Sequence, residues 1–322
     1  MQVRGLCKRF AQRRGLFSAE LPALTAVDSV SLTIPRGAIY GLVGESGAGK
    51  STLARCILQL LKPDRGEVLL HGRDLCRADA TELRAARRKL QVIFQDPLAA
   101  LSPRRTVRQS LLEPLEQFAP ERKAEWEQRC LEALEQVDLD RELLPRLPRQ
   151  LSSGQRQRVC IARALVSRPD LIIADEAVSA LDVSVQAHIL ELVRALRDRH
   201  GIAFLFISHD LGVIAQVADQ VGIMFGGRIV ESGTREAVFG SPAHPYTREL
   251  LSAVPDPDPE VPFRPLRTGA IGSGATGDGC IFAQRCPEVM DRCRRMKPPD
   301  FLLDSDSQHR VECLLHEPVS RS

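Results

Sequence analysis

The chain has 322 residues, of which 43% are hydrophobic, and this is enough for one large domain with an appendage or for two ordinary domains. Its 44 Lys and Arg residues nearly balance its 41 Asp and Glu residues, which excludes a strong global charge that would attract nucleic acid. The apolar runs are strand-sized, and the N-terminus lacks the apolar core of a signal peptide. We therefore expect a folded protein that stays in the cytoplasm.

The predicted elements alternate between strands and helices. Residues 24–43 predict a strand, a turn and a buried strand that ends at a glycine-rich loop, and a helix follows from Lys50. Residues 97–165 carry apolar side chains at three- and four-residue spacing, which indicates a helical insertion. Two short apolar runs, 170–175 and 203–208, are typical of buried parallel strands. The predicted fold class is α/β.

The composition changes after residue 241, where prolines become frequent and the segment TGAIGSGATGDG follows. We expect a first domain over residues 1–250, a linker rich in Pro and Gly over 251–279, and a small cysteine-bearing extension over 280–322. The sequence shows no internal repeat, so the first domain carries one set of nucleotide-binding motifs.

The segment GESGAGKS, residues 44–51, fits the phosphate-loop pattern G-x-x-x-x-G-K-[ST] between a predicted strand and a predicted helix. Its glycines let backbone N–H groups turn toward phosphates, Lys50 adds a full positive charge, and the Ser51 hydroxyl can bind Mg²⁺. The alternative without a function is a glycine-rich turn in which the lysine occurs by chance. The predicted ATP-binding residues of this loop are Gly44, Glu45, Ser46, Gly47, Ala48, Gly49, Lys50, Ser51 and Thr52.

Two carboxylates end the apolar run LIIADE. Asp175 at the tip of a buried strand suits a group that holds Mg²⁺ through water, and the adjacent Glu176 can polarise an attacking water. An acidic pair that only caps a strand is the alternative, and the pair alone does not decide between them.

The segment LSSGQRQRV, residues 151–159, lies just upstream of this acidic strand and resembles the LSGGQ signature of ATP-binding cassette (ABC) ATPases. Gln95 in VIFQDP resembles the Q-loop of that family, residues 179–182 resemble its D-loop, and His209 resembles its switch histidine. Because these motifs follow one another in the family's order, the first domain is identified as a P-loop NTPase ABC ATPase domain. The resemblance implies a RecA-like core plus a helical subdomain at about 97–165.

The resemblance also implies a head-to-tail dimer in which ATP lies between the phosphate loop of one subunit and the signature of the other. Glu176 is then the catalytic carboxylate and His209 the γ-phosphate sensor, while Gln95 contacts the nucleotide site and links it to the helical subdomain. The predicted residues that face the partner's ATP are Ser152, Ser153, Gly154, Gln155 and Asp182.

The sequence departs from the usual family pattern at two places. Ser153 stands where the family usually has the first glycine of a pair, so its side chain faces the approach to the partner subunit's γ-phosphate. Ala177 and Val178 replace the usual Pro and Thr, and we expect the chemistry to survive because both carboxylates remain. For adenine stacking, Phe10 fits the family position best, and Phe17 is the alternative.

Residues 94–115, residues 241–255 and the cysteine-bearing tail resemble the ATPases of oligopeptide, dipeptide and nickel importers. This resemblance implies a subunit on the cytoplasmic face of the bacterial inner membrane. Its implied partners are two permease subunits, a second ATPase that is a paralogue or another copy, and, indirectly, a periplasmic solute-binding protein. Peptides are the favoured substrate and nickel is the alternative; an exporter ATPase or a soluble ABC protein of repair or translation fits less well. Residues 84–90 are basic without aromatic residues, so we expect no nucleic-acid partner.

The chain has nine cysteines, and five of them are predicted to be small core residues: Cys7, Cys56, Cys76, Cys130 and Cys160. The other four, Cys280, Cys286, Cys293 and Cys313, are separated by five, six and nineteen residues. These gaps are wider than in zinc knuckles and fit a [4Fe–4S] cluster at least as well as zinc. The resemblance to importer ATPases for which such a cluster is plausible favours the cluster, with a structural role in a tail that has little core. Zinc, or no metal at all, is the alternative.

Overall fold

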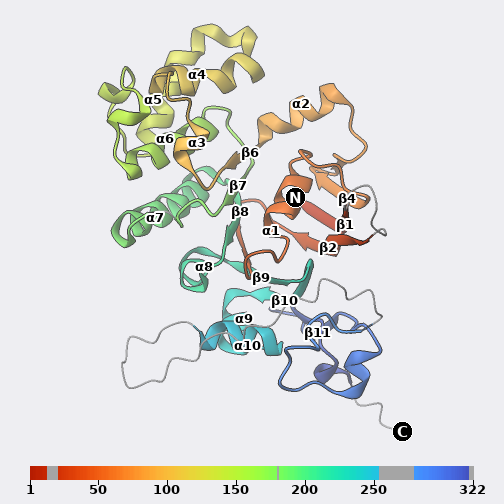
Figure 1. Ribbon diagram of the computed structural model, residues 1–322. Helices are drawn as coiled ribbons and strands as arrows, with labels where there is room; N and C mark the ends of the chain where they lie inside the picture. The colour runs from red at the N-terminus through yellow and green to blue at the C-terminus, as the bar shows by residue number, and fades with distance from the viewer. Residues whose placement is uncertain (13–20, 180, 254–278, 319–322) are drawn as a thin grey trace. The chain divides into compact units, whose positions relative to one another are not determined.

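The computed structural model describes residues 1–12, 21–179, 181–253 and 279–318, and the chain divides into two compact units (Figure 1). The first unit contains Met1, Thr33–Ile39 and Leu69–Ser208. The second unit contains the described parts of Gln2–Leu32, Tyr40–Val68 and His209–Ser322. Phe17, most of the predicted linker and the last four residues of the predicted extension lie outside the described residues.

Three parallel strands form the sheet of the first unit, with β7 (Leu171–Asp175) between β6 (Leu90–Ile93) and β8 (Ala203–Ser208). All six residues of β8 are buried, and only Asp175 at the end of β7 is partly exposed. Strands covered on both faces need a continuous apolar sequence, which LIIAD and AFLFIS supply. The structure thus confirms the two strands predicted at 170–175 and 203–208.

Residues 97–165 of the first unit form a group of helices in which α6 (Ser153–Leu165) packs against three shorter helices (Figure 1). The apolar positions of α6, including Val159 and Ile161, are buried in this group. The three shorter helices are α3 (Pro97–Ala100), α4 (Val107–Phe118) and α5 (Trp126–Gln136). The unit's remaining elements are β5 (Arg73–Asp74), α2 (Ala80–Lys89), α7 (Val183–His200) and the 3-10 turns η1 (Pro120–Glu125), η2 (Arg141–Leu143) and η3 (Pro148–Gln150).

The second unit is built on five strands in the order β3, β9, β10, β12, β11. The pair β3–β9 is parallel and the other pairs are antiparallel, so the C-terminal extension contributes two strands to this sheet. The strands are β3 (Ile39–Val43), β9 (Gln220–Phe225), β10 (Arg228–Thr234), β11 (Phe301–Asp304) and β12 (His309–Val311). The helices and turns are α1 (Lys50–Ile57), α8 (Leu211–Val217), α9 (Arg235–Gly240), α10 (Pro245–Ser252), η4 (Asp291–Arg294) and η5 (Leu314–His316).

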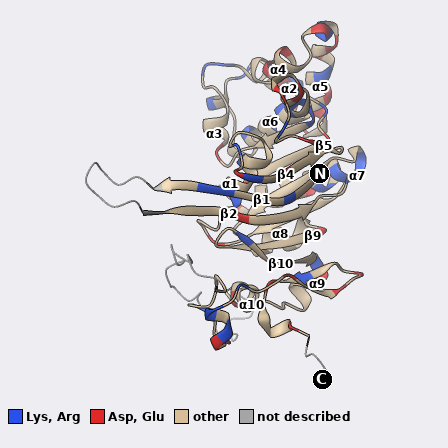
Figure 2. Cartoon of the chain, turned by 90° about the vertical axis from the view of Figure 1, so that its right-hand side faces the viewer, with Lys and Arg blue, Asp and Glu red and all other residues tan. Residues whose placement is uncertain are grey.

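A second sheet in the same unit places β1 (Gln2–Gln12) between β2 (Leu21–Thr33) and β4 (Arg65–Leu70). Figure 2 shows β1 and β2 running side by side toward the residues that are not described. The inward side chains, among them Leu6, Val27 and Val68, are completely buried, so this sheet has a core face of its own.

A buried carboxylate attaches the C-terminal extension to β10. Glu231 is 1% exposed, and it accepts hydrogen bonds from the N–H groups of Ala243 and His244 and from Nε2 of His309, each at 2.8 Å. Burial alone would raise the pKa of Glu231, but these hydrogen bonds outweigh it and lower the pKa below its ordinary value. The carboxylate is therefore ionised, and it joins β10, the start of α10 and β12.

We expect Glu231→Gln to lower the free energy of unfolding at pH 7 by about 1–3 kcal/mol, because an amide cannot accept all the hydrogen bonds of the carboxylate. The pKa of Glu231 in the folded chain lies below its ordinary 4.5, so its stabilising effect is present above pH 4.5 and is lost as pH falls through the folded pKa. Urea unfolding between pH 7 and 3.5 should show a smaller acid-induced loss for the variant.

The exposed Glu121 gives the matched control, and Glu121→Gln should change the free energy of unfolding by less than about 0.5 kcal/mol. If the unfolding free energy of Glu231→Gln depends on pH as that of the wild type does, the Glu231 carboxylate is not the source of the pH-dependent stability.

Candidate functional site

The phosphate loop leaves β3 and enters α1 through two glycines with left-handed backbone. Gly47 has φ +83° and Gly49 has φ +105°, a region that side chains disfavour. A Cβ atom at Gly49 would lie 2.2 Å from the carbonyl oxygen of Ala26, whereas one at Gly47 would meet no atom within 4 Å. The loop therefore needs glycine at position 49 for both its backbone conformation and the close approach of β2.

Lys50 lies at the first position of α1 and turns its side chain back over the loop. Its Nζ donates to the carbonyl oxygens of Gly44 at 2.6 Å and Glu45 at 3.0 Å, and the residue is only 5% exposed. A buried ammonium held by carbonyl oxygens adds positive charge at the N-terminal end of α1, where the helix dipole is also positive. This end of the helix is suited to phosphate.

Glu45 is held from outside the loop by residues near the C-terminus. Its N–H donates to the hydroxyl of Tyr246 at 3.1 Å, and its carboxylate forms a two-pronged ion pair with Arg285 at 2.9 and 3.0 Å. No local pattern in the sequence marks Arg285 or Tyr246, so neither residue could be predicted to contact the loop.

The acidic strand brings two of the predicted catalytic residues into contact. Nε2 of Gln95 donates to Oε2 of Glu176 at 2.9 Å. Glu176 follows Asp175 directly and has φ +50°, an unusual value for a residue with a side chain, while its N–H donates to the carbonyl of Ile207 at 3.0 Å. Strained backbone of this kind is concentrated at functional sites, and here it sets the direction of the Glu176 side chain.

The signature segment forms the capped N-terminus of α6. Ser152 Oγ accepts from the N–H of Gln155 at 3.2 Å, and Gln155 Oε1 accepts from the N–H of Ser152 at 2.9 Å. Ser153 is exposed on the first turn, whereas Gly154 is buried against α7, where a Cβ would lie 2.9 Å from Val185. The glycine at 154 is therefore required by packing, while Ser153 fits without displacing any part of its own unit.

Asp182 begins α7, and its Oδ1 accepts from the N–H of Val185 at 3.0 Å and from the Ser184 hydroxyl at 2.7 Å. The first of these hydrogen bonds, helped by the second, lowers the pKa of this exposed carboxyl. His209 is also exposed, and it lies between the end of β8 and Asp210, which caps α8.

The remaining predicted site residues differ in how far they are exposed to solvent. Phe10 is 36% exposed in β1, and Nζ of Lys8 lies 5.7 Å from the centre of its ring. In the loop, Ser46 is exposed, Ala48 is buried, and Ser51 and Thr52 are partly buried. The phosphate loop, Phe10 and His209 belong to the second unit, and Gln95, Asp175, Glu176, the signature and Asp182 belong to the first.

The C-terminal cysteines come close together in the extension, since the N–H of Cys280 donates to the carbonyl of Cys293 at 2.8 Å. Burial raises the pKa of Cys280 and Cys286 and raises that of Cys313 to about 11. Among the described residues, however, no group of three or more His, Cys, Asp or Glu side chains is arranged to hold a metal ion. The thiols instead pack as apolar groups in two clusters, Cys293 with Leu314 and Cys313 with Val311, so the structure does not support the predicted metal site.

All nine cysteines are free thiols, and Cys56, Cys130 and Cys160 are buried as predicted. Cys7 and Cys76 are only partly buried, so they contribute less to the core than expected.

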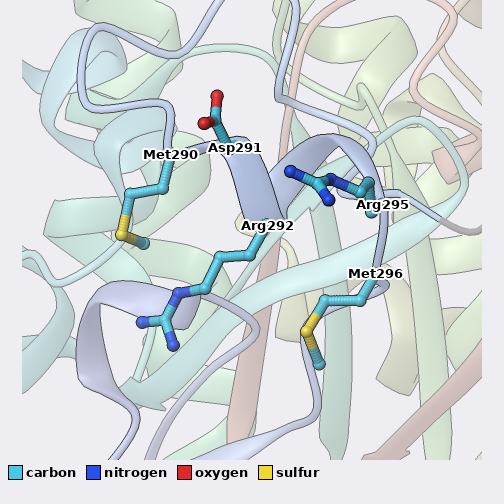
Figure 3. Close-up of a pocket in the computed structure, with 5 residues that line it drawn as sticks. All are labelled: Met290, Asp291, Arg292, Arg295 and Met296. Atoms are coloured by element: carbon cyan, nitrogen blue, oxygen red, sulfur yellow. The ribbon is translucent and has the colours of Figure 1, made fainter.

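The extension also carries a pocket of about 430 Å³ around η4 (Figure 3). Another pocket, of about 740 Å³, lies in the first unit along β5 and α2. Neither pocket contains a predicted ATP-site residue, so they do not contribute to the site described above. The residues that line the pocket in the extension are Met290, Asp291, Arg292, Arg295 and Met296.

Comparison with known proteins agrees with this combination of phosphate loop, acidic strand and signature. The family described as "ABC transporter" matches residues 27–179, and the family described as "Oligopeptide/dipeptide transporter, C-terminal region" matches residues 230–293. The chain is 43% identical to a probable peptide ABC transporter ATP-binding protein of Sinorhizobium fredii, over 99% of this chain and 91% of that protein. It is 42% identical to the oligopeptide transport ATP-binding protein OppF of Escherichia coli, over 92% of this chain and 89% of that protein.

Solved structures show the same fold. The dimeric structure of MJ0796, a bacterial ABC transporter cassette, matches with a TM-score of 0.64 and 29% identity, over 73% of this chain and 98% of that chain. The structure of cbiO1 from Clostridium perfringens, part of the ABC transporter complex cbiONQ, matches with a TM-score of 0.64 and 26% identity, over 74% and 90% of the two chains.

The chain belongs to the ABC transporter ATPases, within the group of peptide ABC transporter ATP-binding proteins. The ABC ATPase fold predicted from the sequence motifs is confirmed. Within the part of the chain that the structure describes, no helix is long and apolar enough to cross a membrane.

We expect Gly49→Ala to lower the free energy of unfolding by about 2–4 kcal/mol, since it adds left-handed strain to a collision with the Ala26 carbonyl. Gly47→Ala is the matched control, because it carries the same kind of strain into open space and should cost only about 1–2 kcal/mol. Equal losses in thermal or urea unfolding would show that the approach of β2 does not constrain the loop.

Proposed function

We propose that this chain is the ATP-hydrolysing subunit of an importer that carries oligopeptides or dipeptides across the bacterial inner membrane. The observation that carries the proposal is the phosphate loop with Lys50 turned over it, in a chain whose C-terminal region matches that of oligopeptide and dipeptide transporters. The peptide transport proteins of Sinorhizobium fredii and Escherichia coli, similar over almost the whole chain, support peptide as the substrate.

The binding roles follow from the chemistry of each group. The loop N–H groups and Lys50 bind the phosphates, while the Ser51 hydroxyl would bind Mg²⁺ directly and the Asp175 carboxylate would hold it through water. Mg²⁺, bound with ATP, neutralises the charge that develops on the phosphates during hydrolysis. Phe10 offers an exposed ring on which adenine can stack.

Glu176 orients the attacking water and accepts its proton, and the Gln95 amide holds the carboxylate at 2.9 Å in the observed structure. His209 contacts the γ-phosphate. The amides at the start of α6, with Ser152, Ser153, Gly154 and Gln155, bind the γ-phosphate of a second subunit, and Asp182 lies at the same dimer face. ATP therefore joins two ATPase subunits, and its hydrolysis releases them.

The partners in this proposal are two permease subunits, a second ATPase subunit and, through the permeases, a periplasmic solute-binding protein. The chain works on the cytoplasmic face of the inner membrane, where ATP is available. The similar cassette MJ0796 has a dimeric structure, which supports the two-subunit arrangement.

The proposal also has an iron–sulfur part, in which Cys280, Cys286, Cys293 and Cys313 bind a [4Fe–4S] cluster, with Zn²⁺ as the alternative metal. The cysteine spacing and the family resemblance support it, whereas the described cysteines are not arranged as a metal-binding group. The cluster therefore stays a prediction of the sequence, and no step of the ATPase depends on it.

We expect Glu176→Gln to bind ATP with nearly wild-type affinity and to hydrolyse it at least about a hundredfold more slowly, because the amide cannot accept the proton of the attacking water. Cells that depend on this chain, with its permeases and its ATPase partner, should import labelled di- and oligopeptides with the wild-type chain and fail with the variant. Glu191→Gln, at an exposed carboxylate of α7, is the control and should support normal uptake.

Uptake of labelled Ni²⁺ is measured in the same cells. If the cells take up nickel but not peptides when the chain is present, nickel rather than peptide is the substrate. ATP hydrolysis by Glu176→Gln at the wild-type rate would contradict the proposed role of that carboxylate.

Iron and zinc content decide the metal question. We expect the anaerobically purified full-length chain to contain about four iron atoms per molecule, with broad visible absorption that is lost when Cys293 is changed to Ser. Free thiols at all nine cysteines, with neither iron nor zinc, would reject any metal in the extension.

A further inference from the structure

The guanidinium of Arg285 lies buried beside the phosphate loop, although it comes from the C-terminal extension. Its side chain is 7% exposed, and it donates to the two carboxylate oxygens of Glu45 at 3.0 and 2.9 Å and to Glu249 Oε1 at 3.4 Å. The ion pair with Glu45 raises the pKa of Arg285, so the guanidinium is charged. A two-pronged arginine–carboxylate pair whose guanidinium is buried has a fixed geometry, which makes it a positioning contact.

Three aromatic rings surround the same guanidinium. Its central carbon lies 5.5 Å from the ring centre of Phe225, 5.6 Å from that of Phe282 and 5.9 Å from that of Tyr246. The rings exclude water and attract the cation, so the guanidinium has little freedom to move away from Glu45. All three aromatic residues are buried.

Glu45 transmits this constraint to the loop. Its N–H is fixed by the Tyr246 hydroxyl, and its carbonyl oxygen accepts from Lys50 Nζ at 3.0 Å and from the N–H of Ala48 at 3.1 Å. Glu45 therefore binds Arg285 through its side chain and Lys50 through its backbone carbonyl.

The charges give the pair a second effect. The Glu45 carboxylate belongs to a loop suited to binding phosphates, and an unpaired carboxylate there would repel them. At an effective dielectric constant of about 20, one unit charge about 10 Å from another still changes a binding constant by roughly tenfold. Arg285 cancels this repulsion because it neutralises the carboxylate.

We propose that Arg285 is a positioning residue for the phosphate loop, and that through Glu45 the C-terminal extension sets the affinity of the loop for ATP. This inference rests on the proposed ATPase function and adds to it a role for the extension that needs no metal. Arg285 contacts neither phosphate nor water in this role, and it acts only through Glu45.

The test measures the affinity of the purified full-length chain for MgATP by titration with a fluorescent ATP analogue. We expect Arg285→Gln to raise the dissociation constant about tenfold, the size expected for one unneutralised charge near the phosphates. Because Arg285 acts only through the Glu45 carboxylate, adding Arg285→Gln to the variant Glu45→Gln should change the dissociation constant by less than about threefold.

Two further variants separate positioning from folding. Arg285→Lys keeps the charge but loses the two-pronged geometry, and we expect a dissociation constant about threefold above wild type at an unchanged melting temperature. Arg310→Gln is the matched control, because Arg310 pairs with Asp300 at 2.8 Å on the surface of the same extension and does not contact the loop. It should bind ATP as the wild type does.

Wild-type affinity in Arg285→Gln would overturn the inference, and so would a roughly tenfold rise of the dissociation constant when Arg285→Gln is added to Glu45→Gln. A lower melting temperature with unchanged affinity of the folded protein would make Arg285 structural only, which also rejects the inference. No ATP binding by the wild-type chain would instead reject the proposed function itself.

Discussion

The contact on which the rest of the site depends is the one between the Lys50 ammonium and the carbonyl oxygens of Gly44 and Glu45. It requires a loop that turns tightly between a fully buried strand and the first turn of a helix, and only glycine at position 49 allows both the turn and the approach of β2. Because the ammonium is buried, it is shielded from water and attracts a phosphate more strongly than an exposed charge would. The buried sheet therefore serves the loop as a rigid support.

Much of this site could be predicted from the sequence because its determinants are local. The loop conformation depends on glycines within six residues of Lys50, and the apolar runs before Asp175 and His209 have the length and composition typical of buried strands. Gln95 and Glu176 are 81 residues apart, and the family resemblance predicted that both belong to the ATP site but not that they form a hydrogen bond. Spacing alone contains no information on such a pair.

The contacts of the C-terminal extension could not be predicted, for the opposite reason. Arg285 and Glu45 are 240 residues apart, and neither has a neighbouring pattern that marks it as half of an ion pair. The cysteine spacing is compatible with a cluster, but spacing does not determine tertiary packing, which places Cys293 and Cys313 in two apolar groups. His309 lies near those cysteines in the sequence, but its side chain forms a hydrogen bond with Glu231.

The extension is thus fixed to the ATPase fold by two carboxylates, the buried Glu231 and the partly buried Glu45, and the two contacts have different consequences. Glu231 binds backbone N–H groups and a histidine from β10, α10 and β12, so it stabilises the attachment whatever the loop contains. Glu45 belongs to the phosphate loop, and its contact with Arg285 is therefore coupled to whatever the loop binds. Coupling of this kind is reciprocal: if the extension strengthens phosphate binding, bound phosphate must hold the extension more tightly by the same factor. A small C-terminal segment can in this way respond to the nucleotide without contacting it.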